Sequence, residues 1–182
     1  MLYEGALTFR EFAVNEPLPL ATVHDAVMEF LQGRDDAALY GAQAVNAYVD
    51  QPRMTQDVDL LSTRAAALAE QLREFLAGRF HIAIRVRTVA GGAAYRLYQV
   101  RTPKNRHLVA VRYVAELPPC NRLQQILVLA APELVAHKVI SMVSRSKTPK
   151  GLIDGADLRR LLLSFPELRT EEGPVLRILT AM

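Results

Sequence analysis

The chain of 182 residues is 51% hydrophobic and 23% charged, a composition ordinary for a globular protein with one well-buried core. A single cysteine, Cys120, excludes an internal disulfide and favours a reducing compartment. No window approaches about eighteen uncharged apolar residues, and the N-terminus lacks a basic segment followed by an apolar one. We therefore expect a soluble, cytoplasmic protein without a membrane partner.

The net charge of +3 conceals a strong segregation of charge along the chain. Residues 1–74 carry a net charge of −7, residues 75–150 one of +11, and residues 151–182 one of −1. No acid occurs between Phe75 and Ala115, where eight basic residues stand: Arg79, Arg85, Arg87, Arg96, Arg101, Lys104, Arg106 and Arg112. This block either steers a nucleotide or an RNA backbone toward an acidic site, or forms a solvated strand face balanced by the acidic N-terminal third.

The first third of the sequence predicts an arm, a helix, a strand and a short helix, in that order. Residues 1–19 contain two prolines and are expected to form an extended arm or an edge strand. Apolar residues at helical spacing begin at Leu20, and Gly33 ends that helix. We expect a core strand at Ala37–Tyr40, a short helix at Ala42–Val49, and then a loop into an apolar strand that carries two aspartates.

The middle of the chain predicts a helix followed by an antiparallel meander. Thr63 is expected to cap a helix that stops near Gly78. From Phe80 the hydrophobic period changes to two, which indicates a strand, and two further strands are expected at Ala94–Arg101 and His107–Val114. We expect this meander to lie beside the strand with the two aspartates.

The last third of the chain predicts mainly helices. Residues 124–129 form either one more strand or part of a loop. A helix is then expected to begin at Pro132 and to end at Ser144, followed by a polar basic loop containing Pro149 and Gly151. The remaining predicted elements are a helix at residues 154–164 and an amphipathic segment that ends at Met182.

Asp57 and Asp59 form the most informative motif, because strand interiors disfavour aspartate. Alternate residues of a strand share a face, so both carboxylates project to one side, roughly 6–7 Å apart, while Val58 projects to the other. Unpaired, the two charges would repel, whereas a divalent cation such as Mg²⁺ or Mn²⁺ removes the repulsion and binds phosphate oxygens. Gly41 allows a tight turn whose backbone N–H groups approach a phosphate. The predicted ligand is a metal-bound polyphosphate.

This stretch resembles the minimal signature of the nucleotidyltransferase (DNA polymerase β-like) superfamily, which is a small-residue turn after a strand and an Asp-x-Asp on the next strand. The segments that begin with Gly41-Ala42 and with Arg53 are similar to those of abortive-infection type E toxins and related toxin–antitoxin nucleotidyltransferases. Ala42 replaces the second Gly or Ser of the signature, so a hydroxyl contact to phosphate is missing. The resemblance implies Asp57 and Asp59 as catalytic metal ligands, with an NTP as substrate.

The same resemblance extends to the C-terminal part. Toxin-type members carry a helical Lys, a later Arg, a basic loop and an Asp-x-x-Asp, and this order is met by Lys138, Arg145, Lys147, Asp154 and Asp157. It implies that Lys138 binds phosphate and that Asp157 orients a basic side chain or acts as a base, both as catalytic residues. Arg145 shares a helix face with Lys138 and is expected to point at the triphosphate.

Several of these residues also have a purely structural interpretation. Asp154 could be an N-cap and Asp157 an acid in the first helical turn. Arg53 either grips a phosphate or pairs with Asp50, and Thr55 either contacts nucleotide or is simply a good strand residue. Lys138 could belong to a solvated helix face. The sequence leaves these alternatives open.

The expected fold is α+β, a nucleotidyltransferase-type mixed sheet flanked by helices within a single domain over residues 1–182. Its core covers about 20–117, and a small C-terminal helical part covers about 130–182. Superfamily members usually add a third carboxylate from a neighbouring strand, but Ala110 or Arg112 stands at that position. The expected function is Mg²⁺-dependent transfer of a nucleoside monophosphate to tRNA or protein, with a cognate antitoxin as a partner. The alternatives are a decayed nucleotide- or RNA-binding regulator and a drug-modifying nucleotidyltransferase.

Overall fold

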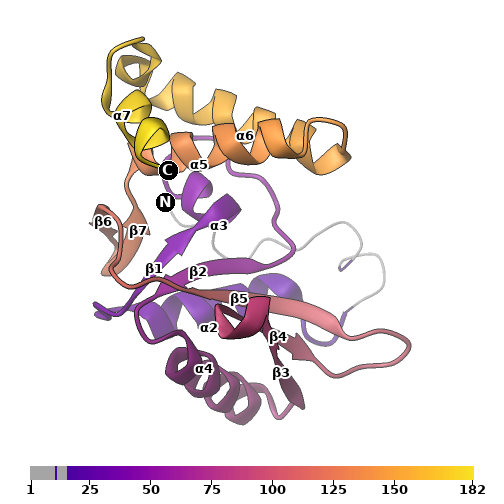
Figure 1. The fold of residues 1–182 in the computed structure, drawn as a ribbon. Helices are drawn as coiled ribbons and strands as arrows, with labels where there is room; N and C mark the ends of the chain where they lie inside the picture. The colour runs from indigo at the N-terminus through magenta and orange to yellow at the C-terminus, as the bar shows by residue number, and fades with distance from the viewer. Residues whose placement is uncertain (1–10, 12–15) are drawn as a thin grey trace.

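The computed structural model describes residue 11 and residues 16–182, and its centre is a seven-stranded mixed sheet (Figure 1). The strands are β1 Ala37–Tyr40, β2 Val58–Ser62, β3 Ile84–Val89, β4 Ala94–Gln99, β5 Arg106–Tyr113, β6 Cys120–Leu123 and β7 Ile126–Leu129. Their spatial order is β3-β4-β5-β2-β1-β7-β6. The α+β expectation is confirmed. The arm or edge strand predicted at residues 1–19 lies largely outside the described residues.

The sheet is mixed because it contains both antiparallel and parallel pairs of strands. The expected meander is confirmed, since β3, β4 and β5 pair antiparallel in sequence order. Its last strand lies parallel to β2, which in turn pairs antiparallel with β1, and β1 lies parallel to β7. The aspartate strand β2 is therefore the central strand of the sheet.

Helices cover the sheet on one side and at one end. In Figure 1, α2 and α4 lie below the sheet, where α4 packs on β2 to β5 and α2 on β5 and β7, whereas the C-terminal helices lie above β1 and β2. The helices are α2 Leu20–Leu31, α3 Gly41–Asn46, α4 Ala65–Phe80, α5 Ala131–Ser144, α6 Pro149–Ser164 and α7 Pro174–Ala181, with short 3-10 turns at Ala90–Gly92 and Pro166–Arg169. None of these helices is long and apolar enough to cross a bilayer, as far as the described ranges extend.

The core forms between the apolar face of the sheet and the apolar faces of the helices. Val58 and Leu60 of β2 are fully buried, and so are Leu68, Leu72 and Leu76 of α4. Because alternate strand residues point to opposite faces, burying Val58 and Leu60 turns Asp59 to the other face. The apolar face of the sheet thus fixes the direction of its acids.

The sequence missed strand β6. Residues 124–129 were predicted as one strand or a loop, but Gln124 and Gln125 form the turn of a hairpin that joins β6 to β7. Both glutamines have positive φ, 47° and 66°, as a two-residue hairpin turn requires. Such turns usually contain Asn or Gly, so the two glutamines do not indicate a turn by residue type.

Two predicted helix starts are wrong. Helix α4 begins at Ala65 with Arg64, rather than Thr63, at its N-cap, and the hydroxyl of Ser62 accepts from the Arg64 N–H at 3.0 Å. The start of α6 lies at Pro149, where the hydroxyl of Thr148 accepts from the Gly151 N–H at 3.2 Å. Pro149 is compatible with a first helical turn, so the predicted basic loop is partly helical.

Two further boundary expectations are corrected by the same helices. Helix α4 continues past Gly78 to Phe80, because one glycine costs a helix only about 1 kcal/mol. Asp154 and Asp157 lie within α6 and not at its first turn, so their interpretation as capping residues is wrong.

Candidate functional site

Asp57 and Asp59 lie on the sheet face opposite α4. Asp59 is the second residue of β2, and Asp57 directly precedes the strand. Val58 between them is fully buried, whereas the two aspartates are only partly buried. In the register of the sheet, Asp59 lies between Tyr40 of β1 and Ala110 of β5. We call Asp57 and Asp59 the acid pair.

Gly41 approaches the acid pair so closely that a side chain at this position would collide with Asp59. Its φ of +69° belongs to the left-handed region, which L side chains rarely adopt. A Cβ built on Gly41 would lie 2.4 Å from Oδ2 of Asp59. The turn from β1 into α3 therefore passes directly over this carboxylate, and Ala42 follows as the second residue of α3.

The acid pair carries surplus negative charge. Burial, and then the charge of Asp57, raise the pKa of Asp59 above its ordinary value, and Lys150 and Lys138 offset only part of this. A hydrogen bond from His107 lowers the pKa of Asp57, with burial acting in the opposite direction. A divalent cation would relieve this strain, because it favours both charged carboxylates.

His107 reaches the acid pair because β5 contains a bulge. Between β4 and β5 the register shifts, so that Leu97 faces Val109 while Tyr98 faces His107, which leaves Leu108 as the extra residue. The bulge turns His107 onto the face of Asp57, and its Nδ1 lies 2.9 Å from Oδ2 of Asp57. Strict alternation along β5 would place His107 on the opposite face, which is why the sequence did not single it out.

A second group of charges is built around Lys138 on α5. Its Nζ donates to Oδ1 of Asp154 at 2.9 Å and to Oδ2 of Asp157 at 2.8 Å, and all three residues are buried. Arg53 donates to both oxygens of Asp157, at 2.7 and 2.8 Å. Arg145 and Arg160 each approach one of the carboxylates at 3.3 Å. We call these six residues the Lys138 cluster.

Both carboxylates of the Lys138 cluster are paired with cations, and the cluster still has a surplus of positive charge. Its four cations outnumber its two carboxylates. Burial alone would raise the pKa of Asp157, but the hydrogen bond from Arg53 and the charge of Lys138 lower it below its ordinary value. Lys138 also acts on the charge of Asp59, so this positive cluster lies within electrostatic reach of the acid pair.

The loop that carries Arg53 is anchored by α3. Asn46 donates from its side chain to the Arg53 carbonyl at 2.7 Å and accepts from the Arg53 N–H at 3.0 Å. The same amide group of Asn46 donates to Gln43 at 3.2 Å, and Gln43 lies 3.1 Å from Nδ1 of His24. Burial lowers the pKa of His24 to about 4. A buried hydrogen-bond chain therefore runs from α2 to the Lys138 cluster.

The structure locates the other residues predicted for the site. Arg53 pairs with Asp157 and not with Asp50, so that alternative is wrong. The hydroxyl of Thr55 is buried and has no hydrogen-bond partner among the described residues. Arg145 lies at the C-terminal end of α5, with its guanidinium 3.3 Å from Asp154. Lys138 is buried in its cluster and is not part of a solvated helix face.

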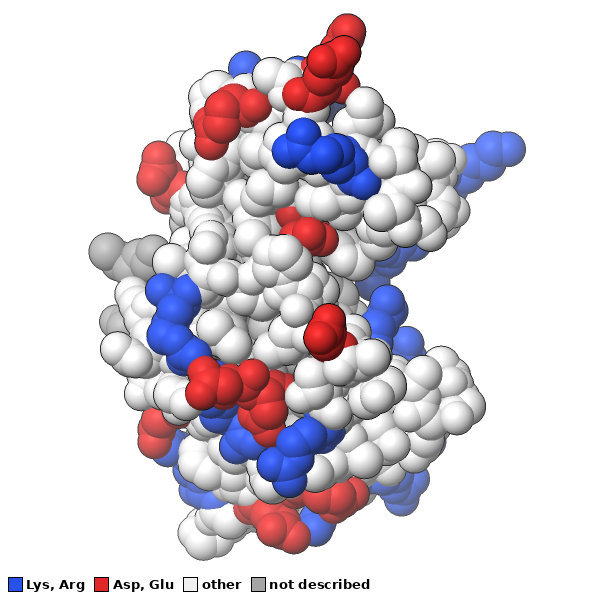
Figure 2. All heavy atoms as spheres, turned by 60° about the vertical axis from the view of Figure 1, so that its left-hand side comes forward, with Lys and Arg blue, Asp and Glu red and all other residues white. Residues whose placement is uncertain are grey.

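The acid pair and the Lys138 cluster come from two parts of the molecule. Figure 2 shows the surface hollowed between the C-terminal helices, at the top, and the sheet with α4, at the bottom, with Lys and Arg side chains bordering the hollow. No group of three or more His, Cys, Asp or Glu is arranged to hold a metal by itself within the described part of the chain. The acid pair would therefore hold a cation together with oxygens from its ligand, which is how Mg²⁺ is bound with phosphates.

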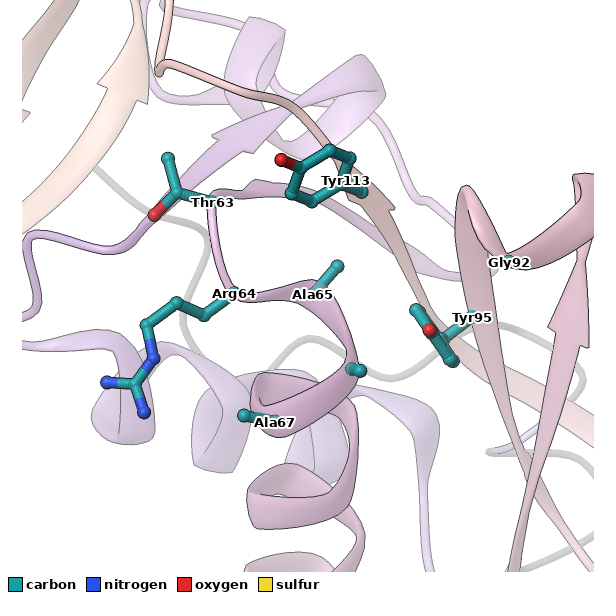
Figure 3. A pocket seen from close by; sticks show the side chains of 8 residues that line it. Thr63, Arg64, Ala65, Ala67, Gly92, Tyr95 and Tyr113 are labelled. Carbon is teal, nitrogen blue, oxygen red and sulfur yellow. The ribbon is translucent and has the colours of Figure 1, made fainter.

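A separate pocket of about 290 Å³ lies on the other face of the sheet (Figure 3). It is formed by the first turn of α4, Gly92 and the rings of Tyr95 and Tyr113. Tyr95 alternates with Arg96 along β4, and Arg96 shares the face of Asp59. The pocket is therefore not part of the candidate site.

Comparison with solved structures shows a nucleotidyltransferase fold. The Megavirus polyadenylate synthase matches with a TM-score of 0.66 and 12% identity over 90% of this chain and 35% of that chain. JHP933 from Helicobacter pylori matches with a TM-score of 0.59 and 12% identity over 90% of this chain and 70% of its own. A second H. pylori protein, described as a candidate nucleotidyltransferase, matches with a TM-score of 0.53 and 10% identity over 94% of this chain and 88% of its own.

These likenesses are of fold and not of close sequence. No protein-family model matches the sequence, and no curated protein is significantly similar to it. The chain spans about a third of the length of the Megavirus protein.

Proposed function

We propose that this chain is a magnesium-dependent nucleotidyltransferase that moves a nucleoside monophosphate from an NTP to a macromolecular acceptor. The observation that carries the proposal is the surplus negative charge of Asp57 and Asp59 beneath Gly41, within reach of the positive Lys138 cluster. A divalent cation and a triphosphate together satisfy both charge imbalances. The fold likeness to the Megavirus polyadenylate synthase supports the same class of reaction.

The chain's own residues bind and orient the triphosphate. Lys138 uses two of its three N–H donors on Asp154 and Asp157, which leaves one for a phosphate oxygen. Arg53 is held by both oxygens of Asp157 and by Asn46, so its remaining donors have a fixed direction. Asp157 thus orients two cations, and the close turn at Gly41 lets the backbone approach a phosphate.

The transfer step itself depends on positioning and charge. Asp57 and Asp59 would hold Mg²⁺ or Mn²⁺, which would neutralise charge on the phosphates. The acceptor hydroxyl attacks the α-phosphorus and gives up its proton to solvent, the bond from the α-phosphorus to the α–β bridging oxygen breaks, and pyrophosphate leaves among the cations of the Lys138 cluster. His107 holds Asp57 in place through their 2.9 Å contact. The toxin-type resemblance makes tRNA ends and protein hydroxyls the acceptors to test, and a cognate antitoxin the partner to seek.

One observation favours a second candidate, a nucleotide- or RNA-binding regulator without turnover. Ala110 lies directly beside Asp59 in the sheet, so β5 supplies no third carboxylate at that place. Without this carboxylate, one metal site would lack a ligand, and β5 would supply no base at that place for the acceptor hydroxyl.

Labelled NTPs separate the two candidates. We expect label from one of the four NTPs to appear on tRNA or protein in the presence of Mg²⁺, and to disappear with Asp57→Asn. Asp50→Asn removes an exposed carboxylate seven residues earlier in the chain and is the matched control, which should keep full activity. NTP binding that needs Asp57 but never leads to incorporation would favour the regulator, and label on small molecules alone would favour a drug-modifying enzyme.

A further inference from the structure

Arginines of β3 and β4 lie in register with the acid pair. Reading across the sheet, Arg87 of β3 faces Arg96 of β4, which faces Ala110 of β5, and Ala110 faces Asp59. Residues that face each other in neighbouring strands project from the same face. The face that presents Asp59 therefore continues as a basic surface for three strands, or roughly 14 Å at the usual strand spacing.

Two more arginines enlarge this surface. Arg85 lies two residues before Arg87, and Arg112 lies two residues after Ala110, so both share the same face. All four arginines of the set are exposed. We call Arg85, Arg87, Arg96 and Arg112 the arginine face.

The arginine face differs from most other arginines of residues 16–182 because no described acidic residue pairs with it. Ion pairs within the described residues hold Arg34, Arg53, Arg73, Arg79, Arg101, Arg106, Arg122, Arg145 and Arg160. The segment that forms β3, β4 and β5 contains no acid at all. Because nothing in the described part of the chain neutralises these charges, they are available to an anionic partner.

Aromatic rings lie between the arginines. The guanidinium of Arg87 lies 5.5 Å from the centre of the Tyr98 ring, and that ring lies 5.0 Å from the ring of His107. His107 contacts Asp57, so a continuous run of flat side chains leads from β3 to the acid pair. Nucleobases stack on aromatic rings and on arginine planes, while arginines also neutralise backbone phosphates.

We propose that the arginine face binds a single-stranded polynucleotide whose end reaches Asp57 and Asp59. This inference rests on the proposed function, because it supplies the acceptor for that reaction. Open sheets that present aromatic and basic side chains commonly bind two or three stacked bases in this way. The neighbouring rows of positive and flat side chains fit a chain of phosphates and bases better than they fit an acidic protein, which offers charge without bases.

Fluorescence anisotropy with an unstructured oligouridylate of about twelve nucleotides tests the surface directly. We expect Arg87→Gln combined with Arg96→Gln to weaken binding at least tenfold, and to reduce the slope of log affinity against log salt by about 1.4. Arg159→Gln combined with Arg177→Gln removes two exposed arginines from α6 and α7 and should leave both quantities unchanged. Circular dichroism checks that each variant is folded.

Three outcomes would overturn the proposal. One is equal loss of affinity in the control variant, which would mean that binding follows net charge and not this face. Another is tighter binding to a polyglutamate peptide of equal charge than to the oligonucleotide. A third outcome, with no oligonucleotide binding by the wild type, would leave the arginines as protection of the β3 edge against association.

The same samples keep the two proposals distinguishable. Binding of an NTP with Mg²⁺ should be unaffected by the Arg87 and Arg96 changes, because neither residue belongs to the acid pair or to the Lys138 cluster. Oligonucleotide binding without any transfer would support the arginine face and contradict the enzyme. NTP binding and transfer without oligonucleotide binding would do the reverse. An oligodeoxyuridylate in parallel shows whether the 2′-hydroxyl is recognised.

Discussion

The molecule contains two pairs of nearby aspartates in opposite electrostatic states. Asp154 and Asp157 are buried on α6, and cations contact both of them. Asp57 and Asp59 lie at the start of β2, where His107 is the one ion-pair partner of Asp57 within the described residues, and burial together with Asp57 raises the pKa of Asp59. Cations therefore neutralise the aspartates of α6, whereas the charge of the acid pair is not fully neutralised by the described residues.

This difference teaches how to separate structural from functional charge. A balanced buried pair stabilises the fold only as a unit, since removing one partner leaves an uncompensated charge. An unbalanced pair costs stability and is retained where a ligand supplies the missing charge. Removing charge from the two pairs should consequently change stability in opposite directions.

The largest expected effect comes from Asp157→Asn. Lys138 and Arg53 would lose their shared carboxylate, and breaking such a buried pair costs about 3–5 kcal/mol of unfolding free energy. Urea denaturation followed by circular dichroism measures it. Asp59→Asn is the matched change in the other pair, and we expect it to leave stability unchanged or to raise it by up to about 1 kcal/mol. A comparable loss in both variants would contradict the difference between the pairs.

The two pairs also differ in how much of their structure could be predicted from the sequence. The acid pair could be predicted, because aspartates at i and i+2 in an apolar strand share a face whatever the rest of the fold does. The helix, strand and meander around it followed from hydrophobic periods of 3.6 and 2, which are local properties. Gly41 was singled out for the same local reason, since a turn between two elements favours glycine.

The partners of the site residues are set by long-range contacts and could not be predicted from the sequence. Arg53 and Asp157 are 104 positions apart, and nothing local indicates that they meet. His107 was missed because a bulge reverses its face, and Asn46 because its role is to anchor a loop. A proline that is compatible with the first turn of a helix concealed the true start of α6, and with it the burial of Asp154.

His24 should make the stability of the fold depend on pH, and its hydrogen-bond chain leads to the loop that carries Arg53. Its pKa is lowered from 6.5 to about 4 by burial, so between these values the unfolded chain binds a proton that the folded chain does not. Stability should therefore fall as pH drops from 6.5 to 4, by up to about 3 kcal/mol. We expect His24→Gln to flatten this slope in urea titrations at several pH values.

His81→Asn is the control for the pH experiment. His81 is exposed, and its positive φ suits asparagine, so the slope of stability against pH should stay as in the wild type. An unchanged slope in His24→Gln would show that another group causes the pH dependence.

Gly41→Ala tests the contact between the turn and the acid pair. The φ of +69° and a Cβ placed 2.4 Å from Asp59 both disfavour alanine, and we expect a loss of about 2 kcal/mol together with loss of nucleotide transfer. Gly33→Ala isolates the backbone contribution, because Gly33 has a φ of +72° but nothing within 4 Å of its Cβ position. It should cost about 1 kcal/mol and keep transfer intact. Equal effects at both glycines would mean that the approach to Asp59 is irrelevant.

The smallest expected effect is the most direct test of the unbalanced charge, and it needs no substrate. If Asp57 and Asp59 lack a counter-ion, Mg²⁺ alone should stabilise the folded chain, by about 1.4 kcal/mol at tenfold excess over its dissociation constant. Thermal denaturation with and without Mg²⁺ at constant ionic strength measures this shift. Asp59→Asn should abolish it, whereas Asp50→Asn should keep it, because Asp50 lies outside the pair. A shift that survives Asp59→Asn would place the cation elsewhere and remove the electrostatic reason for assigning function to β2.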